Sequence, residues 1–417
     1  MRYRITAPQH IDDTVELPAS KSISNRALII NALCGSDIFP QNLSNCDDTE
    51  VIVRALRDMP AEINIMASGT AMRFLTAYLA VTDSGEHVIT GTERMQHRPI
   101  GVLVEALRRL GADITYERAE GYPPLRIRGK KLEGGPLEVP GNISSQFISA
   151  LLIVGPTLSQ GMELKLEGNV ISRPYIDLTL CTMRDFGARV DWTGPDTILV
   201  EPRPYSIVDY YIENDWSAAS YWYEILSLCP DNESEICLTG LMDGSRQGDS
   251  VVRYLFNLLG VRTSFKSKEK GVPTAITLTR HTASLPRLEY DFINQPDLAQ
   301  TFVVTCALLD IPFHFKGLRT LRIKETDRIE ALKSEMRKLG YVVESNESND
   351  LIWDGTRCEP MEHPVIDTYE DHRMAMTFAP AAIKFPGLMI NNPSVVTKSY
   401  PEFWDHLCKA GYHIEEL

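Results

Sequence analysis

The sequence contains no long apolar run, and this absence argues against a membrane-spanning helix. Its longest segment without a charged residue runs from 139 to 162, and only residues 147–154 of that segment are predominantly apolar. A helix that crosses a bilayer needs ~20 apolar residues. The first fifteen residues also lack the apolar core of a secretory signal, so we expect a cytoplasmic protein with no membrane attachment.

The sequence also has fewer basic than acidic residues, and its cysteines are not arranged in closely spaced pairs. Lys and Arg number 42 against 56 Asp and Glu, a formal charge of −14, so binding to nucleic acid or to an anionic membrane has no electrostatic support. Eight cysteines are scattered without a C-x-x-C pair, and there is no HExxH motif, which favours reduced thiols over disulfides or a zinc site. The 417 residues, 43% of them hydrophobic, predict a globular enzyme for small molecules.

One pattern recurs along the chain: an amphipathic charged helix, a glycine, and then a short strand of alternating polarity. The five copies span residues 103–116, 178–192, 251–265, 328–343 and 402–417. Glycine suits the left-handed residue that closes a helix, and repetition at a near-constant spacing indicates repeated structural units. A sixth copy at 50–65 lies much closer to its successor, so we expect the first repeat to be shortened by roughly a strand pair.

A second kind of helix, which starts with small polar residues and continues apolar, is expected between these copies. It is predicted at 20–33, 68–80, 143–154, 215–226, 296–309 and 370–382. Ser, Asn and Asp at the openings are typical N-cap residues, and the apolar interiors predict burial. The two patterns together predict an α/β protein of about six α/β units, three in each of two domains.

Several of these helix openings carry more polar groups than capping needs. The residues concerned are Lys21, Ser22, Arg26, Arg73, Ser144, Ser145, Gln146, His372 and Arg373. Any one opening can be a cap and nothing more. However, a helix N-terminus has free N–H groups and a positive dipole end, so several openings that converge on one cleft would bind a polyanionic small molecule.

Nine short motifs follow one another in a specific order. They are LPASKSISNRAL (17–28), SGTAMR (68–73), RMQHRPIG (94–101), GNISSQF (141–147), SRPYID (172–177), QPDLAQT (295–301), RIKETDRIE (322–330), YEDHRMAM (369–376) and VTKSYPEF (396–403). Each motif is moderately specific, and nine in order are highly specific. With them the chain resembles the EPSP synthase family, the 3-phosphoshikimate 1-carboxyvinyltransferases, over roughly residues 17–410.

The resemblance implies a fold that agrees with the repeats. It implies two similar domains, each of three repeated α/β units in an inside-out α/β barrel, with helix N-termini facing an interdomain cleft. The first domain would comprise residues 18–213, with a shortened first repeat, and the second residues 1–17 together with 214–417. The resemblance also implies a monomer that needs no cofactor and no metal ion.

The resemblance further implies a reaction of the shikimate pathway, in aromatic amino acid biosynthesis. The enolpyruvyl (carboxyvinyl) group of phosphoenolpyruvate would pass to the 5-hydroxyl of shikimate 3-phosphate, giving 5-enolpyruvylshikimate 3-phosphate and phosphate through a tetrahedral intermediate. By motif match, Asp297 would act on the 5-hydroxyl. Lys21 and Glu325 are candidates for proton transfer at the methylene carbon, and their division of labour is left open.

The same motif matches imply two overlapping sets of ligands, rich in cations because both substrates are anions. The set for phosphoenolpyruvate is Lys21, Gly69, Arg98, Gln146, Arg328, Arg373 and Lys398. The set for shikimate 3-phosphate is Lys21, Ser22, Arg26, Ser144, Ser145, Gln146, Ser172, Tyr175, Asp297 and Lys324.

Two other functions are kept as alternatives. An enolpyruvyl transferase that uses UDP-N-acetylglucosamine usually carries a Cys just ahead of the Arg-Pro of its mobile loop, whereas residues 95–97 before Arg98 contain none. A non-catalytic relative with a binding role is suggested by the shortened repeat and by Ala67, where the family commonly has Asn. Phe74 and Thr320 are further departures, so the response to the phosphoenolpyruvate-like herbicide glyphosate is not predicted.

Overall fold

In the computed structural model, which describes residues 1–83, 85–267 and 269–417, the strands form five four-stranded sheets. The sheets have the strand orders β2-β11-β13-β12, β14-β15-β17-β16, β18-β19-β1-β20, β3-β4-β6-β5 and β7-β8-β10-β9. In each of them the first two strands are parallel and the remaining neighbours are antiparallel. One βαβαββ unit is therefore repeated along the chain.

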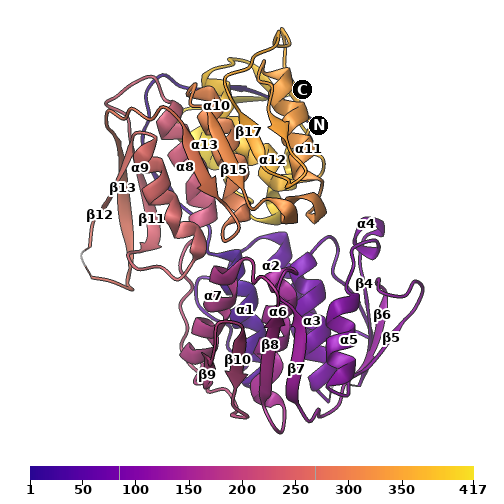
Figure 1. Cartoon of the computed structure of the whole chain (residues 1–417). Helices are drawn as coiled ribbons and strands as arrows, with labels where there is room; N and C mark the ends of the chain where they lie inside the picture. Colours follow the sequence, from indigo (N-terminus) through magenta and orange to yellow (C-terminus); the bar gives the residue numbers. More distant parts are fainter. Residues whose placement is uncertain (84, 268) are drawn as a thin grey trace. The chain divides into compact units, whose positions relative to one another are not determined.

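The chain divides into two compact units (Figure 1). Unit 1 consists of Met1–Pro18 and Glu213–Leu417, and unit 2 consists of Ala19–Ile212. Both ends of the chain lie in unit 1, where strands β1 and β20 pair with each other.

Unit 1 holds three of the sheets and the helices that connect their strands. Its strands are β1 (Arg2–Thr6), β2 (Asp12–Glu16), β11 (Glu235–Met242), β12 (Val261–Phe265), β13 (Pro273–Arg280), β14 (Leu288–Asp291), β15 (Phe313–Lys316), β16 (Glu344–Ser345), β17 (Leu351–Trp353), β18 (Val365–Ile366), β19 (Leu388–Asn391) and β20 (His413–Glu416). Its helices are α8 (Trp216–Leu228), α9 (Val252–Leu258), α10 (Ala299–Leu308), α11 (Arg328–Lys338), α12 (His372–Phe378) and α13 (Phe403–Lys409), with short 3-10 turns η2 (Gly248–Val251), η3 (Pro296–Leu298), η4 (Arg319–Ile323), η5 (Ala379–Ile383) and η6 (Pro393–Lys398).

Unit 2 holds two sheets and one additional pair of helices. Its strands are β3 (Glu62–Asn64), β4 (Glu86–Thr90), β5 (Asp113–Tyr116), β6 (Leu125–Arg128), β7 (Gly135–Pro140), β8 (Met162–Glu167), β9 (Val190–Trp192) and β10 (Thr197–Val200). Its helices are α1 (Lys21–Leu33), α2 (Asp47–Asp58), α3 (Gly69–Val81), α4 (Glu93–Gln96), α5 (Gly101–Arg109), α6 (Ser145–Val154) and α7 (Arg173–Asp185), with the 3-10 turn η1 (Gly155–Thr157).

The first repeat of unit 2 has helices but no sheet of its own among the residues described. Between α1 and α2 the chain forms only an isolated bridge, which joins Gln41 to Tyr211. The strand expected after the sixth copy of the pattern is β3, but it pairs in parallel with β4 and so belongs to the next sheet. Within the described residues, the first repeat of unit 2 therefore lacks more of its sheet than the strand pair whose loss the sequence predicts.

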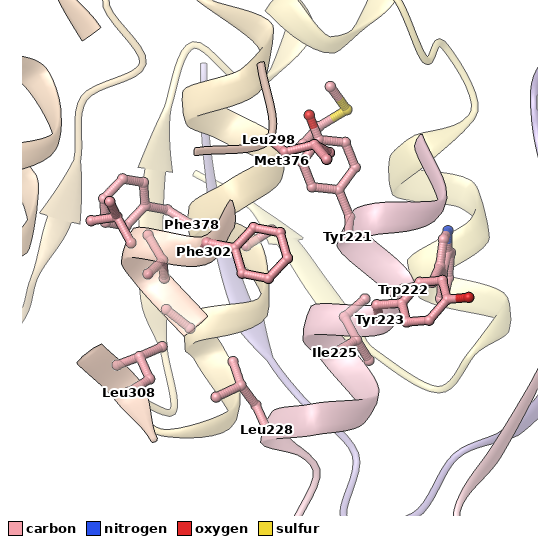
Figure 2. Close-up of a cluster of buried hydrophobic side chains, with 14 of the residues drawn as sticks. Tyr221, Trp222, Tyr223, Ile225, Leu228, Leu298, Phe302, Leu308, Met376 and Phe378 are labelled. Atoms are coloured by element: carbon pink, nitrogen blue, oxygen red, sulfur yellow. The ribbon is translucent and has the colours of Figure 1, made fainter. Parts of the chain in front are cut away.

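Three mainly apolar helices form the centre of each unit. In unit 1, α10 packs against α8 and α12, and in unit 2, α1, α3 and α6 pack on one another. Every residue of α10 is buried, whereas strand β8 alternates buried and exposed residues and so has one face in solvent. Figure 2 shows this core in unit 1, where Tyr221 and Tyr223 of α8, Phe302 of α10 and Phe378 of α12 lie in one apolar cluster. Within the range described, no helix combines the length and the apolar content that crossing a bilayer requires.

The glycines that mark the ends of the repeated helices have the left-handed backbone conformation that the sequence predicts. The glycines that end the five copies all have positive φ: Gly111 98°, Gly187 84°, Gly260 92°, Gly340 92° and Gly411 94°. In the sixth copy Met59 takes the same left-handed position, with φ 38°. The strand expected at 341–343 is absent, because Tyr341 only bridges to Arg357 and β16 begins at Glu344.

The polar openings of the second helix type act as caps. The side chains of Ser20, Ser68, Ser144, Asp215 and Asp371 each accept a backbone N–H of the helix that follows. The exception is the opening at 296, where η3 leads into α10 without a side-chain cap. Capping thus accounts for the serines and aspartates, but not for the cations beside them.

One carboxyl group lies in the apolar centre of unit 1 rather than at its polar end. Glu224 of α8 is 0% exposed, and within the described chain neither of its carboxyl oxygens makes a hydrogen bond of normal geometry. The nearby Thr305 hydroxyl donates to the Thr301 carbonyl at 2.7 Å. Burial raises the pKa of Glu224 well above its usual 4.5, with only partial relief from Thr305.

Replacing Glu224 is expected to stabilise the protein in a pH-dependent way. Because the pKa of this carboxyl is higher in the folded state, the unfolded chain binds fewer protons once the pH exceeds about 4.5, and stability falls as pH rises. Glu224→Met should therefore raise the thermal midpoint at pH 8 by a few degrees, for a gain of roughly 1–3 kcal/mol. The gain should shrink toward pH 5 in calorimetric scans. An equal gain at both pH values would contradict this explanation.

Candidate functional site

Seven charged side chains of unit 1 are joined by ion pairs into one network, which we call the carboxylate–cation cluster. It comprises Asp297, Lys324, Glu325, Arg328, Asp371, Arg373 and Lys398. The members come from η3, from the residues at the starts of α11 and α12, and from the end of η6. The structure thus brings together all six site residues that the sequence predicts in this unit, and adds Asp371.

Asp297 is the carboxylate with the most cations around it. Its Oδ1 lies 2.8 Å from Arg328 Nη1 and 3.3 Å from Lys324 Nζ, and its Oδ2 lies 3.4 Å from Arg373 Nη2. Burial alone would raise the pKa of Asp297, but the attraction of Lys324, Arg373 and Arg328 outweighs it and holds that pKa well below its usual range. Asp297 is therefore ionised at neutral pH.

Arg328 connects three carboxylates through one guanidinium group. It is the first residue of α11, and its side chain is only 2% exposed. Nε and Nη2 bond to Asp371 at 2.7 and 3.2 Å, Nη1 bonds to Asp297 at 2.8 Å, and Nη2 also reaches Glu325 at 3.1 Å. Burial would lower the pKa of Arg328, but the three carboxylates raise it above the usual value, so this buried group stays charged.

Glu325 is held between two cations. Lys398 Nζ donates to Glu325 Oε1 at 2.7 Å, while Arg328 occupies Oε2. Lys398 ends η6, and both Glu325 and Lys398 are mostly buried. A carboxylate and an ammonium group in contact offer a proton acceptor and a proton donor at one place.

The charges of the cluster do not cancel. Its four cationic side chains face three carboxylates, which leaves one net positive charge. The internal carboxylates reduce repulsion among the four cations, and the remaining charge favours one further anionic group.

The predicted residues of unit 2 lie at the starts of its helices. Lys21 is the first residue of α1, and its Nζ is 3.1 Å from Oδ2 of the buried Asp48 on α2. This pairing fixes the ammonium group beside a helix N-terminus, where the dipole also attracts anions.

Arg26 ties three helices together. Its guanidinium donates to Thr179 Oγ1 at 2.7 Å, to the Ser22 carbonyl at 2.8 Å, to Ser149 Oγ at 3.2 Å and to the Tyr175 carbonyl at 3.3 Å. Burial lowers the pKa of Arg26 to about 10, which still leaves it charged at neutral pH. Ser22 and Tyr175 are therefore ordered by the same buried cation.

Gly69, Arg73 and Arg98 meet at the start of α3. Arg73 donates to the Gly69 carbonyl at 2.8 Å and to the Pro99 carbonyl at 3.3 Å, so it joins the helix to the loop that carries Arg98. A Cβ at Gly69 would lie only 2.7 Å from Nη1 of both arginines. Glycine lets the Arg98 guanidinium lie directly against the backbone here, and a side chain would displace both arginine tips.

The remaining predicted residues of unit 2 lie at the starts of α6 and α7. Gln146 donates through Nε2 to Thr70 Oγ1 at 3.1 Å, which links α6 to the start of α3. Ser144 caps α6, and Ser145 is buried as its first residue. Ser172 precedes α7 with a left-handed φ of 53°, a conformation that costs a non-glycine residue about 1–3 kcal/mol.

Sequence reasoning missed the acidic partners of these cations. Asp371 lies inside the YEDHRMAM motif but reads as a helix cap, and Asp48 lies in a helix outside all nine motifs. The signal available for Asp371 is an acidic residue two positions before Arg373, an expected ligand of phosphoenolpyruvate. Of the departures from the family pattern, Phe74 is buried with its ring 5.6 Å from the Arg26 guanidinium, and the buried Thr320 hydroxyl has no hydrogen-bond partner within the described chain.

Among the residues that the structure describes, no group of three or more His, Cys, Asp or Glu side chains is arranged to hold a metal ion.

Comparison with known sequences gives a consistent result. The family model described as EPSP synthase (3-phosphoshikimate 1-carboxyvinyltransferase) matches residues 5–68 and 60–407. A 3-phosphoshikimate 1-carboxyvinyltransferase from Bacteroides fragilis (strain ATCC 25285) is 56% identical over 415 residues, covering 100% of this chain and 99% of the relative. One from Aliivibrio fischeri (strain MJ11) is 35% identical over 425 residues, covering 95% and 96%.

Comparison with solved structures gives the same fold. An EPSP synthase from Acinetobacter baumannii matches with a TM-score of 0.77 at 20% identity, over 100% of both chains. The enolpyruvyl transferase NikO from Streptomyces tendae matches with a TM-score of 0.74 at 16% identity, over 99% of this chain and 98% of the other. Since the family model spans most of the sequence and a full-length relative is more than half identical, the chain belongs to the EPSP synthase family of 3-phosphoshikimate 1-carboxyvinyltransferases.

Proposed function

We propose that this chain transfers the enolpyruvyl group of phosphoenolpyruvate to the 5-hydroxyl of shikimate 3-phosphate, releasing phosphate. The observation that carries the mechanism is the carboxylate–cation cluster, which holds two ionisable carboxylates, Asp297 and Glu325, among four cations. In the addition step the hydroxyl oxygen bonds to C2 of phosphoenolpyruvate, the hydroxyl loses its proton, and C3 gains one. In the elimination step C3 loses a proton and the C2–O bond to phosphate breaks.

Asp297 is proposed to act on the 5-hydroxyl. Its low pKa keeps it ionised, so it can accept a hydrogen bond from the hydroxyl, but the same cations make it a weak base. Its basicity would rise when a substrate anion draws Arg373 and Lys324 toward itself. Substrate binding would then prepare the carboxylate to receive the proton.

Proton transfer at the methylene carbon is assigned to Lys21 and Glu325 together. Glu325 is paired with Lys398, and Lys21 with Asp48, so the charged form that each group takes before or after its proton transfer is stabilised by a partner of opposite charge. Which of the two gives the proton and which removes it stays open.

The phosphoenolpyruvate ligands fall into two groups under this proposal. Arg328, Arg373 and Lys398 would bind the carboxylate, because the single net positive charge of their cluster matches one anionic group. Lys21, Gly69, Arg98 and Gln146 of unit 2 would bind the phosphate. Guanidinium groups and free helix N–H groups are suited to both tasks.

Shikimate 3-phosphate is proposed to bind mainly through unit 2. The residues involved would be Lys21, Ser22, Arg26, Ser144, Ser145, Gln146, Ser172 and Tyr175, with Asp297 and Lys324 from unit 1. Arg26 already donates four hydrogen bonds inside the unit, so its contribution would come from its charge and from ordering Ser22 and Tyr175.

We also propose the domain arrangement that the family pattern implies. Residues 18–213 and residues 1–17 with 214–417 would form two inside-out α/β barrels, and the ligand sets of both would act on one pair of substrates in an interdomain cleft. The division of the chain into units at 18/19 and 212/213 supports these boundaries. We further propose a cytoplasmic monomer that uses no cofactor.

Phosphate release tests the proposed function. The purified protein should release phosphate from phosphoenolpyruvate only when shikimate 3-phosphate is present, and UDP-N-acetylglucosamine should not replace it. Release that depends on UDP-N-acetylglucosamine instead would favour the rival transferase, and no release with either acceptor would favour a non-catalytic relative.

Removing the Lys21 ammonium group should abolish most turnover. Lys21→Ala is expected to lower kcat by about 10²- to 10⁴-fold, the range typical of a lost proton-transfer group. Lys165→Ala serves as the control, because Lys165 pairs with Glu138 at 2.9 Å on the exposed surface. Far-UV circular dichroism should be unchanged in both variants, and near-normal phosphate release by Lys21→Ala would exclude the proposed role.

A side chain at position 69 should weaken phosphoenolpyruvate binding. In Gly69→Ala the new Cβ would approach the tips of Arg73 and Arg98 too closely, and these flexible tips would shift while the backbone stays in place. We expect KM for phosphoenolpyruvate to rise about 10-fold or more, equivalent to ~1.4 kcal/mol, with a smaller change in KM for shikimate 3-phosphate. Gly194→Ala in the same unit is the control, since its Cβ would make only ordinary contacts. Equal KM values for Gly69→Ala and the unmodified protein would remove Arg98 from the site.

A further inference from the structure

Asp371 is a completely buried carboxylate that belongs to neither predicted ligand set. It is 0% exposed, and both of its oxygens bond to the Arg328 guanidinium, at 2.7 and 3.2 Å. Its Oδ1 also accepts the backbone N–H of Arg373 at 2.9 Å, as the cap of α12. One carboxylate therefore fixes the side chain of one proposed phosphoenolpyruvate ligand and the backbone of another.

The chain adopts an unfavourable conformation to place this carboxylate. Tyr369 and Glu370, the two residues before Asp371, both have left-handed backbones, with φ of 54° and 56°. Each such non-glycine residue costs about 1–3 kcal/mol and persists only where the surroundings enforce it. The Asp371 N–H then closes the turn by donating to the Thr368 carbonyl at 2.8 Å.

A second contact with the same helix holds the turn in place. The Tyr369 hydroxyl donates to Glu335 Oε1 at 2.6 Å, and the Asp367 N–H donates to Glu335 Oε2 at 3.1 Å. Glu335 lies two turns along α11 from Arg328, is fully buried, and also pairs with Lys338 at 2.7 Å. Residues 367–371 are thus attached to α11 at two places, Arg328 and Glu335.

The electrostatics give Asp371 a specific task. Arg328 has three carboxylate partners, and the other two, Asp297 and Glu325, are the groups proposed to move protons. Without the charge of Asp371, the buried guanidinium would be drawn toward those two carboxylates and out of line with the substrate carboxylate. Losing Asp371 would leave the Arg328 Nε–H, and part of Nη2, without their carboxylate acceptor in a buried site, and buried donors that lose an acceptor are costly enough to drive this shift.

We propose that Asp371 is a positioning residue. It holds the Arg328 guanidinium and the start of α12 where they can bind the substrate carboxylate, and it keeps Arg328 from moving toward Asp297 and Glu325. This inference rests on the proposed function. It assigns no contact between Asp371 and substrate.

The test is Asp371→Asn, because Asn also caps helices but cannot neutralise Arg328. We expect kcat/KM for phosphoenolpyruvate to fall by about 10- to 100-fold, the size of effect produced by small misplacements of binding groups. Most of the fall should appear in KM for phosphoenolpyruvate, with little change in KM for shikimate 3-phosphate. Asp367→Asn is the matched control, since it removes an ion pair with Lys338 at 2.9 Å from the same segment without touching Arg328 or Arg373.

A double-variant comparison separates positioning from general structural damage. If Asp371 acts through Arg328, adding Asp371→Asn to Arg328→Gln should cost little more than Arg328→Gln alone. If Asp371→Asn does not fold, Tyr369→Phe removes the hydroxyl contact with Glu335, leaves Asp371 in place and should still raise KM for phosphoenolpyruvate several-fold. The inference would be overturned if Asp371→Asn folds and leaves KM for phosphoenolpyruvate unchanged. It would also be overturned by fully additive losses in the double variant. If Asp371→Asn does not fold, an unchanged KM for phosphoenolpyruvate in Tyr369→Phe would overturn it. Absence of turnover in the unmodified protein would instead refute the proposed function.

Discussion

The Arg328 guanidinium is buried, charged and shared by three carboxylates, and the polar end of unit 1 is organised around this interaction. The side chain reaches Asp297, Glu325 and Asp371, which come from three different parts of the chain. A buried charge is tolerated only when its hydrogen-bonding capacity is filled, so each carboxylate is held in place by the need to satisfy the same group. Together with Lys324 and Arg373, Arg328 lowers the pKa of Asp297. It also shares Glu325 with Lys398 and holds Asp371, the residue that caps α12.

This arrangement reconciles an acidic protein with anionic substrates. The chain carries a formal charge of −14, which at first argues against two phosphorylated acids as ligands. The cluster nevertheless has a net positive charge, and Lys21, Arg26, Arg73 and Arg98 add further cations at the helix starts of unit 2. Net charge bears on non-specific partners, whereas local charge decides what a pocket binds.

Local features of the fold could be predicted from the sequence, and long-range ones could not. Gly111 and Gly411 end helices and Ser68 begins one because backbone conformation and capping depend on neighbouring residues. The predicted cations and carboxylates of unit 1 do meet, as expected from residues at helix openings. Arg328 and Asp371, however, are 43 residues apart, and Arg26 bonds to Thr179 across 153 residues. Such pairings are set by tertiary packing, and no sequence period signals them. The missing sheet of the first repeat also exceeded what spacing alone could indicate.

The pairing of β1 imposes an order on the assembly of the two units during synthesis. Unit 2 is one continuous stretch of chain, whereas β1 can pair only once β19 and β20, far along the sequence, have been synthesised. Until then β1 is an unpaired strand, of the kind that aggregates most readily. Arg2 and Arg4 place charge on it, and each ends in a polar contact, Arg2 with Asn391 and Arg4 with Glu415. The charge of the same two arginines disfavours pairing of the strand with another chain before its partners are made, and both arginines have polar partners within the completed sheet.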